Sequence, residues 1–187
     1  MIDTKVISDS TFYICFLDDI SYPEGLKKII CSGKFKFVIG PIVMSEIEKS
    51  PNYHFIKPDL SKVQENPLPF NYGEIVRPFL GIEEIKKGEH EVIGIAIVYY
   101  LMGREFILIL DEDGPREIIE KKLSGLKSKM TGTIGFIKLC YYPYAIYTRE
   151  EAISILEKIR KSKFRVTSNI IDNALKEIRG VTYDNCS

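Results

Sequence analysis

The segment from Glu89 to Leu110 constrains the fold of this chain more strongly than any other part of the sequence. Residues 89–101 favour a helix that is apolar almost all round, so we expect it to be buried. Residues 106–110 form a continuous apolar run, which is typical of a strand covered on both faces in a parallel sheet. A buried helix directly before such a strand predicts an α/β fold.

Further strands and helices alternate through the first 145 residues, as in a protein with a parallel sheet. We expect the other strands at residues 5–8, 36–39 and 127–130. We expect the other helices at residues 11–30 (broken near 22–25), at 41–49 and at 116–123, with one more after Gly132.

Two regions depart from this alternation. Residues 52–80 contain four prolines with aromatic residues between them, so we expect an irregular insertion or loop there. Residues 146–187 read as a helical appendage, because Thr148 and Glu151 have the spacing of a capping box and Ser168 is placed to cap a second helix. The sequence therefore predicts one domain, residues 1–145, followed by a C-terminal helical pair.

Composition excludes several classes of protein. Of the 187 residues, 45% are hydrophobic and 28% are charged, which is typical of a folded chain rather than a disordered one. The 26 basic and 26 acidic residues balance, so no bulk charge attracts nucleic acid. Four cysteines and two histidines lack the spacing of a zinc site. No secretory signal is visible and the longest apolar run is too short to span a bilayer, so we expect a cytoplasmic protein without membrane contact.

Acidic residues follow the expected strands and begin the buried helix. Asp9 follows the first strand, and Glu46 lies one turn into the helix after the second. The acids beside strand 106–110 and at the start of helix 89–101 are Asp111, Glu112, Asp113, Glu89 and Glu91. Because the carboxyl ends of parallel strands meet at one edge of a sheet, these acids should converge. Gathered carboxylates stay ionised beside a cation, and a ligand set of oxygens suits Mg²⁺ or Mn²⁺ and the hydrolysis of a phosphodiester.

Each acid also has a purely structural interpretation. Asp9 and the acids from 111 to 113 are suited to turns and helix caps. Glu46 is suited to a solvated helix face, and Glu89 and Glu91 favour a helix N-terminus through its dipole. The hypothesis of a site depends on the single topology that would bring all of them together.

Four short motifs, in this order, resemble those of the PIN-domain nucleases, and most closely a prokaryotic subfamily related to VapC-type toxins. They are Val6-Ile7-Ser8-Asp9-Ser10, Gly88-Glu89-His90-Glu91-Val92-Ile93, Leu108-Ile109-Leu110-Asp111-Glu112-Asp113 and Thr131-Gly132-Thr133-Ile134-Gly135. The resemblance implies a three-layer α/β/α fold with a central parallel sheet of four or five strands. It also implies that Asp9, Glu46, Glu89 and Asp111 are the catalytic and metal-binding acids, with Glu91 and Asp113 as further candidate ligands. The stretch from about 52 to 78 is long for this subfamily.

The function implied by the resemblance is a Mg²⁺- or Mn²⁺-dependent endoribonuclease that hydrolyses RNA phosphodiester bonds, of a toxin-like kind. An alternative is a PIN-like module that binds RNA or a protein without turnover. A third hypothesis, a phosphatase with Asp9 as nucleophile, is disfavoured because Asp9-Ser10-Thr11 lacks the second acid of the DxDxT pattern.

Three residues are candidates for contact with RNA. Thr133 could bind a phosphate at a helix N-terminus, although N-capping explains it as well. Arg116 and Lys121 belong to a basic run that could contact the RNA backbone or simply form a solvated helix face.

We expect a second copy of the chain as a protein partner, and the resemblance implies an antitoxin as another. Apolar helical residues near both ends of the chain offer a dimer surface. They are Phe12, Ile14, Phe16, Leu17, Ile153, Leu156, Ile171 and Leu175.

Overall fold

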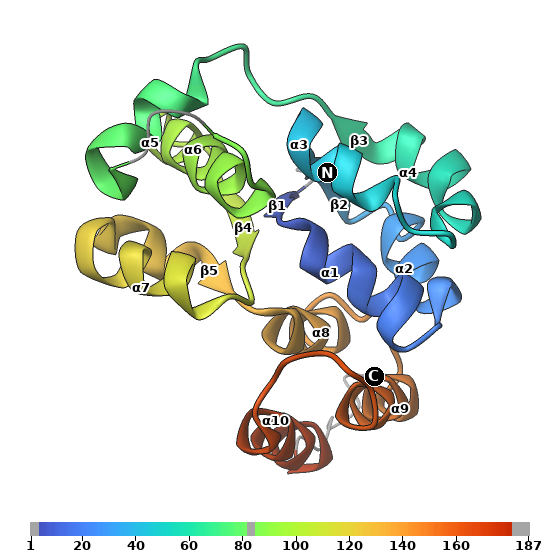
Figure 1. Ribbon diagram of the computed structural model, residues 1–187. Coiled ribbons are helices and arrows are strands. Elements are labelled where there is room, and N and C mark those ends of the chain that lie inside the picture. The colour runs from blue at the N-terminus through green and yellow to red at the C-terminus, as the bar shows by residue number, and fades with distance from the viewer. Residues whose placement is uncertain (1–3, 82–84, 181–187) are drawn as a thin grey trace.

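A five-stranded parallel sheet forms the centre of the computed structural model, which describes residues 4–81 and 85–180 (Figure 1). The strand order is β3-β2-β1-β4-β5. The strands are β1 (Thr4–Ser8), β2 (Phe35–Val38), β3 (Gln64–Glu65), β4 (Phe106–Ile109) and β5 (Met130–Thr131). The predicted α/β fold with a parallel sheet of four or five strands is therefore confirmed.

The strand order creates a topological switch point between β1 and β4. From β1 the chain builds outward through β2 to β3, and it then returns to the other side of β1 to add β4 and β5. In open parallel sheets, the crevice outside the carboxyl ends of the strands at such a point is where ligands bind. Asp9 directly follows β1 and Asp111 lies two residues after β4, the two strands that flank this switch point.

Helices cover both faces of the sheet. On one face, Phe136 of α8 (Thr133–Tyr141) packs on Phe35 of β2 and on Phe12 of α1 (Ser10–Ile14), with ring centroids 5.2 and 5.4 Å apart. Phe106 pairs in register with Lys5, one residue out of phase with Phe35, and so points to the opposite face. There it contacts Tyr99 of α6. This arrangement is compatible with three layers.

Helix α6 (Gly88–Leu101) is the buried helix that the sequence predicts. Between Gly88 and Tyr99, only Glu89 and His90 are not buried. The helix is followed directly by β4, so it runs antiparallel to that strand and its N-terminus lies at the carboxyl edge of the sheet. Across residues 4–81 and 85–180, no helix combines the length and the apolar character that crossing a membrane requires.

The stretch from 52 to 80 is not irregular, and the prediction was wrong there. It forms a short 3₁₀ turn (Tyr53–Phe55), α4 (Lys57–Val63), β3 and α5 (Tyr72–Leu80). Pro58 lies in the first turn of α4, where a missing amide hydrogen costs no helical hydrogen bond. Prolines therefore mark helix starts here as well as breaks, although Pro78 does lie inside α5.

Helix and strand boundaries shift at three other places. The expected helix at 11–30 is divided into α1, a π-helical turn (Cys15–Asp19) and α2 (Pro23–Ile30). Helix α3 (Pro41–Ile47) begins at its proline as predicted, whereas α7 (Asp113–Lys122) begins before Arg116 and includes Asp113. The strand expected at 127–130 is mostly a 3₁₀ helix (Ser124–Lys129), because its polar residues leave only β5 to pair with β4.

The two C-terminal helices pack on α8. Figure 1 shows α9 (Arg149–Arg160) and α10 (Ser168–Gly180) on the far side of α8 from the strands. The predicted capping box is confirmed, since the Thr148 hydroxyl accepts from the Glu151 amide at 3.2 Å and the Glu151 carboxylate accepts from the Thr148 amide at 2.8 Å. The apolar residues that the sequence offered as a dimer surface are mostly used in this packing. Those buried inside the chain are Phe12, Phe16, Leu17, Leu156, Ile171 and Leu175, which corrects the expectation about this surface.

Candidate functional site

The switch point brings two acids together at the carboxyl edge of the sheet. The amide of Asp9 donates to the carbonyl of Ile109, the last residue of β4, at 3.4 Å. Asp111 follows two residues later. The parallel pairing of β1 with β4 therefore holds the two carboxylates in the same region of the structure.

Asp9 is a buried carboxylate with one oxygen that has no partner. The residue as a whole is only 3% exposed. The Oδ1 atom accepts a hydrogen bond from the amide of Thr11 at 3.1 Å and so caps α1. The Oδ2 atom is buried and has no hydrogen-bond partner among the described residues. Burial, followed by the charges of Asp111 and Glu112, raises the pKa of Asp9 to about 8.

Asp111 is held in place by Thr133, from the first turn of α8. Its Oδ1 accepts from the Thr133 amide at 2.8 Å and its Oδ2 from the Thr133 hydroxyl at 2.5 Å. Burial raises the pKa of Asp111, and these two hydrogen bonds oppose the rise. Thr133 is fully buried, so its hydroxyl orients Asp111 rather than facing solvent. Gly132 permits this approach, because a Cβ there would lie 2.9 Å from Asp111 Oδ1.

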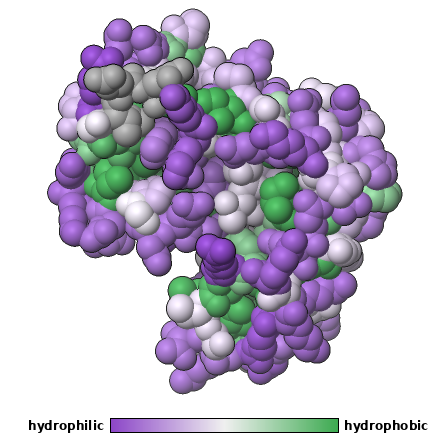
Figure 2. All heavy atoms as spheres, in the orientation of Figure 1, coloured by the Kyte–Doolittle hydropathy of each residue, from purple (hydrophilic) through white to green (hydrophobic). Residues whose placement is uncertain are grey.

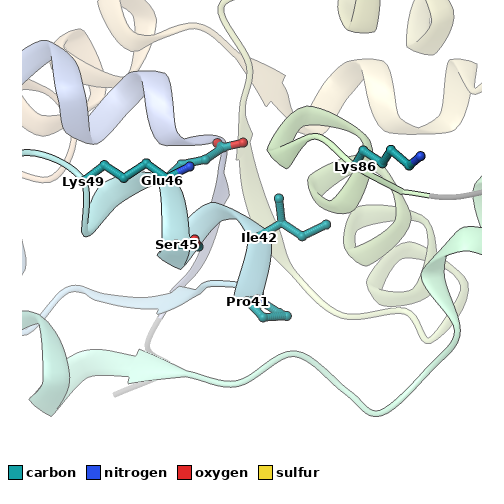
Figure 3. Close-up of a pocket in the computed structure, with 6 residues that line it drawn as sticks. All are labelled: Pro41, Ile42, Ser45, Glu46, Lys49 and Lys86. Carbon is teal, nitrogen blue, oxygen red and sulfur yellow. The ribbon is translucent and has the colours of Figure 1, made fainter.

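Glu46 approaches the same edge from α3. Its Oε2 accepts from the hydroxyl of Ser10, the neighbour of Asp9, at 2.6 Å, and its Oε1 accepts from the amide of Gly88 at 3.2 Å. Glu46 also lines a pocket of about 330 Å³. Figure 3 shows Glu46 and Lys86 on opposite sides of this pocket, with the ammonium end of Lys86 directed away from Glu46. Ser10, which the sequence did not single out, therefore links Glu46 to Asp9.

Glu91 has a structural role that the sequence did not reveal. Its buried carboxylate accepts hydrogen bonds from the amides of Ile42, at 3.1 and 3.2 Å, and Val43, at 3.0 Å. These amides belong to the first turn of α3, which has no side-chain cap of its own. Burial raises the pKa of Glu91, and the two backbone hydrogen bonds oppose this rise. Glu91 thus caps α3 from another helix, and both of its oxygens are occupied.

Gly40→Ala tests this cap through its close packing. A Cβ at position 40 would lie 2.2 Å from Glu91 Cδ, which is closer than real atoms approach. Displacing a buried carboxylate from the amides of Ile42 and Val43, its donors among the described residues, should lower the free energy of unfolding by about 2–4 kcal/mol. Denaturant unfolding measures this loss. Gly114→Ala is the matched control, because open space surrounds position 114 and the free energy of unfolding should change by less than about 1 kcal/mol. Equal effects of the two variants would contradict the assignment.

The remaining candidate site residues lie partly at the carboxyl edge of the sheet and partly on the surface of the protein. The carboxylate of Glu89 lies 3.4 Å from Lys87 Nζ and 3.9 Å from His90 Nε2. Lys121 pairs with Glu117 on the exposed side of α7, away from the acids. Arg116 donates to the carbonyl of Leu110 at 2.7 Å and stays beside Asp111.

As the side chains stand in residues 4–81 and 85–180, no three acids, histidines or cysteines are arranged to hold one metal ion. The negative charges of Asp9 and Asp111 act on one another, and so do those of Glu46 and Glu91. Glu89 instead pairs with Lys87. The four-acid metal site thus stays a prediction. The donor set fits a hard cation at its centre, because Asp9 Oδ2 is a buried, unpartnered oxygen beside a second carboxylate.

A cleft of about 1100 Å³ opens beside Asp111. Its lining comes from the segments 111–116, 130–135 and 163–170, together with Thr11 and Asp19. Figure 2 shows it as a hollow between α7 and the C-terminal helices, with an apolar patch on the side of those helices. We call this space the α7–α10 cleft. Asp111, Glu112, Asp113 and Arg116 line it, whereas Thr133 and Lys121 do not.

The sequence reasoning missed the segment 163–167, which forms one wall of this cleft. The signal was present, because Arg160, Lys161, Lys163 and Arg165 are four basic residues within six positions. That run begins at the last residue of α9 and continues into the connection to α10, and its position opposite the acids depends on how α9 and α10 pack on α8.

No protein-family model, no curated protein and no solved structure matches this sequence or its fold. The nuclease resemblance therefore depends on the four sequence motifs, and any chemistry assigned to the chain depends on the acids at the switch point.

Proposed function

We propose that this protein is a metal-dependent endoribonuclease of the PIN type. The observation that carries the proposal is the buried carboxylate of Asp9. Its Oδ2 has no hydrogen-bond partner among the described residues, and the negative charge of Asp111 repels it. A structural aspartate that only capped α1 would not need a second carboxylate beside it. Two buried acids that repel each other are stabilised together by a cation between them.

In this proposal, the residues of the site have distinct tasks. Asp9 and Asp111 would hold a Mg²⁺ or Mn²⁺ ion, which when bound lowers the pKa of a coordinated water and offsets charge on the phosphate. Thr133 fixes the direction of the Asp111 carboxylate through two hydrogen bonds. Glu46, tied to Ser10 and to the amide of Gly88, borders the same edge and can accept a proton or bind a water molecule. Glu91 keeps α3, and with it Glu46, in position.

The cleft supports a polymeric substrate over a small phosphate ester. Its volume of about 1100 Å³ exceeds what one phosphate ester fills, and it is open along the side of α7 and α10. Basic and acidic residues both line it, as a bound phosphodiester chain and its cation require. The choice of RNA over DNA comes from the sequence motifs.

Divalent metal should be necessary for cleavage. We expect the purified chain to cut single-stranded RNA internally in Mn²⁺ or Mg²⁺, and to lose this activity in excess EDTA. A labelled RNA of mixed sequence, resolved on a denaturing gel, measures the cuts. Cleavage that persists in EDTA would contradict the proposal, and cutting of single-stranded DNA alone would assign the same chemistry to another substrate.

A second candidate is the module that binds RNA without turnover. It is favoured by the engagement of both oxygens of Glu46 and of Glu91, which leaves fewer free ligands than a fully assembled metal site. The two candidates differ in the melting temperature of the protein. Mn²⁺ should raise it for the nuclease, because a ligand that binds the folded state stabilises it. Without that rise and without cleavage, the binding module becomes the better interpretation.

A further inference from the structure

The wall of the α7–α10 cleft opposite the acids carries basic side chains that the proposed chemistry leaves unused. Lys163, Arg165 and Thr167 line this wall, and the segment that holds them connects α9 to α10. Arg165 is exposed and makes no hydrogen bond or ion pair with any described residue. Lys163 lies 3.6 Å from Asp19 with 78% of its side chain exposed, so this pair contributes little and can open.

The segment is held rigidly by the residue between the two cations. Phe164 is buried in the core, and its amide donates to the Ser162 hydroxyl at 3.1 Å. The Ser162 hydroxyl in turn donates to the carbonyl of Ile159 at the end of α9. Anchoring Phe164 fixes the backbone from which Lys163 and Arg165 extend, so both side chains start from a constant place on this wall of the cleft.

Three helix N-termini supply further partial positive charge at the same cleft. The first turns of α7, α8 and α10 supply lining residues, among them Asp113, Gly135 and Ile170. Each helix end carries a partial positive charge from its unpaired amides. Asp111 already accepts from the first amide of α8, whereas Arg165 has no partner among the described residues and Lys163 has its long contact with Asp19.

We propose that Lys163 and Arg165 bind the phosphate backbone of single-stranded RNA in the α7–α10 cleft and hold it against the acids. This inference rests on the proposed function and identifies how that site recognises its substrate. Before a metal ion binds, a strand placed beside Asp111, Glu112 and Asp113 would be repelled, and cations on the facing wall offset this repulsion by holding its phosphates. The half-exposed Ile170 on the same wall offers an apolar contact for a ribose or a base.

Binding should be measured apart from cleavage. Fluorescence anisotropy of a labelled 12-nucleotide single-stranded RNA, in EDTA and over a series of salt concentrations, reports affinity without turnover. We expect Arg165→Ala to weaken binding about 5- to 10-fold and to lower the slope of log K against log salt by about 0.7, the value for one lost contact with a single strand. Lys163→Ala should act in the same direction. Lys161→Ala is the matched control, because Lys161 belongs to the same basic run but does not line the cleft.

The outcomes separate this inference from the proposed function. If Arg165→Ala binds RNA as tightly as Lys161→Ala does, the inference is overturned, whether or not the wild-type protein cleaves RNA. If Arg165→Ala loses affinity and the wild type never cleaves, recognition by the cleft stands and the nuclease proposal fails. If polyglutamate binds in an Arg165-dependent manner and RNA does not, the cleft recognises an acidic protein and the inference is wrong.

Discussion

Asp9→Asn is expected to abolish RNA cleavage and, at the same time, to stabilise the metal-free protein. Asparagine keeps the oxygen that accepts from the Thr11 amide, and its amide group can donate toward the Asp111 carboxylate that repels the native side chain. It removes the negative charge that would bind the metal. Loss of an outer-shell partner of a metal typically lowers activity 10- to 100-fold, so loss of a ligand should cost more than about 100-fold.

The stabilisation should depend on pH in a defined direction. Because the pKa of Asp9 rises from 3.8 to about 8 on folding, the folded state binds this proton more tightly than the unfolded state. The wild-type protein should therefore lose stability as the pH rises from about 4 to 8, and the variant should lose less over this range. At pH 8 in EDTA, the variant should gain on the order of 1–3 kcal/mol in free energy of unfolding, and the gain should disappear below pH 4.

The RNA-cleavage assay measures the loss of activity, and thermal melts with EDTA and with Mn²⁺, run at several pH values, measure the change in stability. Asp172→Asn is the control, because Asp172 is an exposed acid on α10 whose surface pair with Arg160 contributes little. A lower melting temperature for Asp9→Asn in EDTA, with no change in the effect of Mn²⁺, would make Asp9 a structural cap and remove the basis of the nuclease proposal.

Glu91→Ala should have the largest effect on stability among substitutions of the acids at the sheet edge. It leaves the half-buried amide of Ile42 and the buried amide of Val43 without an acceptor and creates a cavity beneath Gly40. Unsatisfied buried donors cost about 1–3 kcal/mol each, so we expect a loss of about 3 kcal/mol in the free energy of unfolding. Glu91→Gln should lose less than half as much, because its amide oxygen still accepts and no charge is buried.

Glu89→Ala provides the comparison on the same helix. Its carboxylate lies 3.4 Å from the exposed Lys87 and 3.9 Å from the partly buried His90, so no buried donor among the described residues loses its acceptor and the loss of stability should stay below about 1 kcal/mol. Urea unfolding in EDTA measures all three variants. If Glu91→Ala kept its metal-free stability but lost the rise in melting temperature with Mn²⁺, Glu91 would be a metal ligand and the cap would be incidental.

The nearby pair Glu89 and Glu91 shows where sequence reasoning reaches its limit. Both lie in the first turn of α6, and the motif marks both as candidate ligands. Residues two positions apart on a helix point about 200° apart, so the two side chains face different surroundings. Only the packing of α3 against α6 decides that Glu91 meets free amides while Glu89 faces Lys87 and His90.

Local sequence patterns are enough to predict the parallel sheet, the buried helix α6 and the positions of Asp9 and Asp111 after two of the strands, whereas the pairing of β1 with β4 comes from the tertiary structure. Each of the predicted features follows from a local pattern in the sequence, since apolar runs predict buried strands and the acids come at the ends of these runs. The tertiary structure alone decided that residues 52–80 are folded, that Thr133 holds Asp111 and that residues 163–167 face the acids across a cleft. These features depend on contacts between residues far apart in the chain, whose geometry is set by how whole helices pack and not by the composition of any one segment.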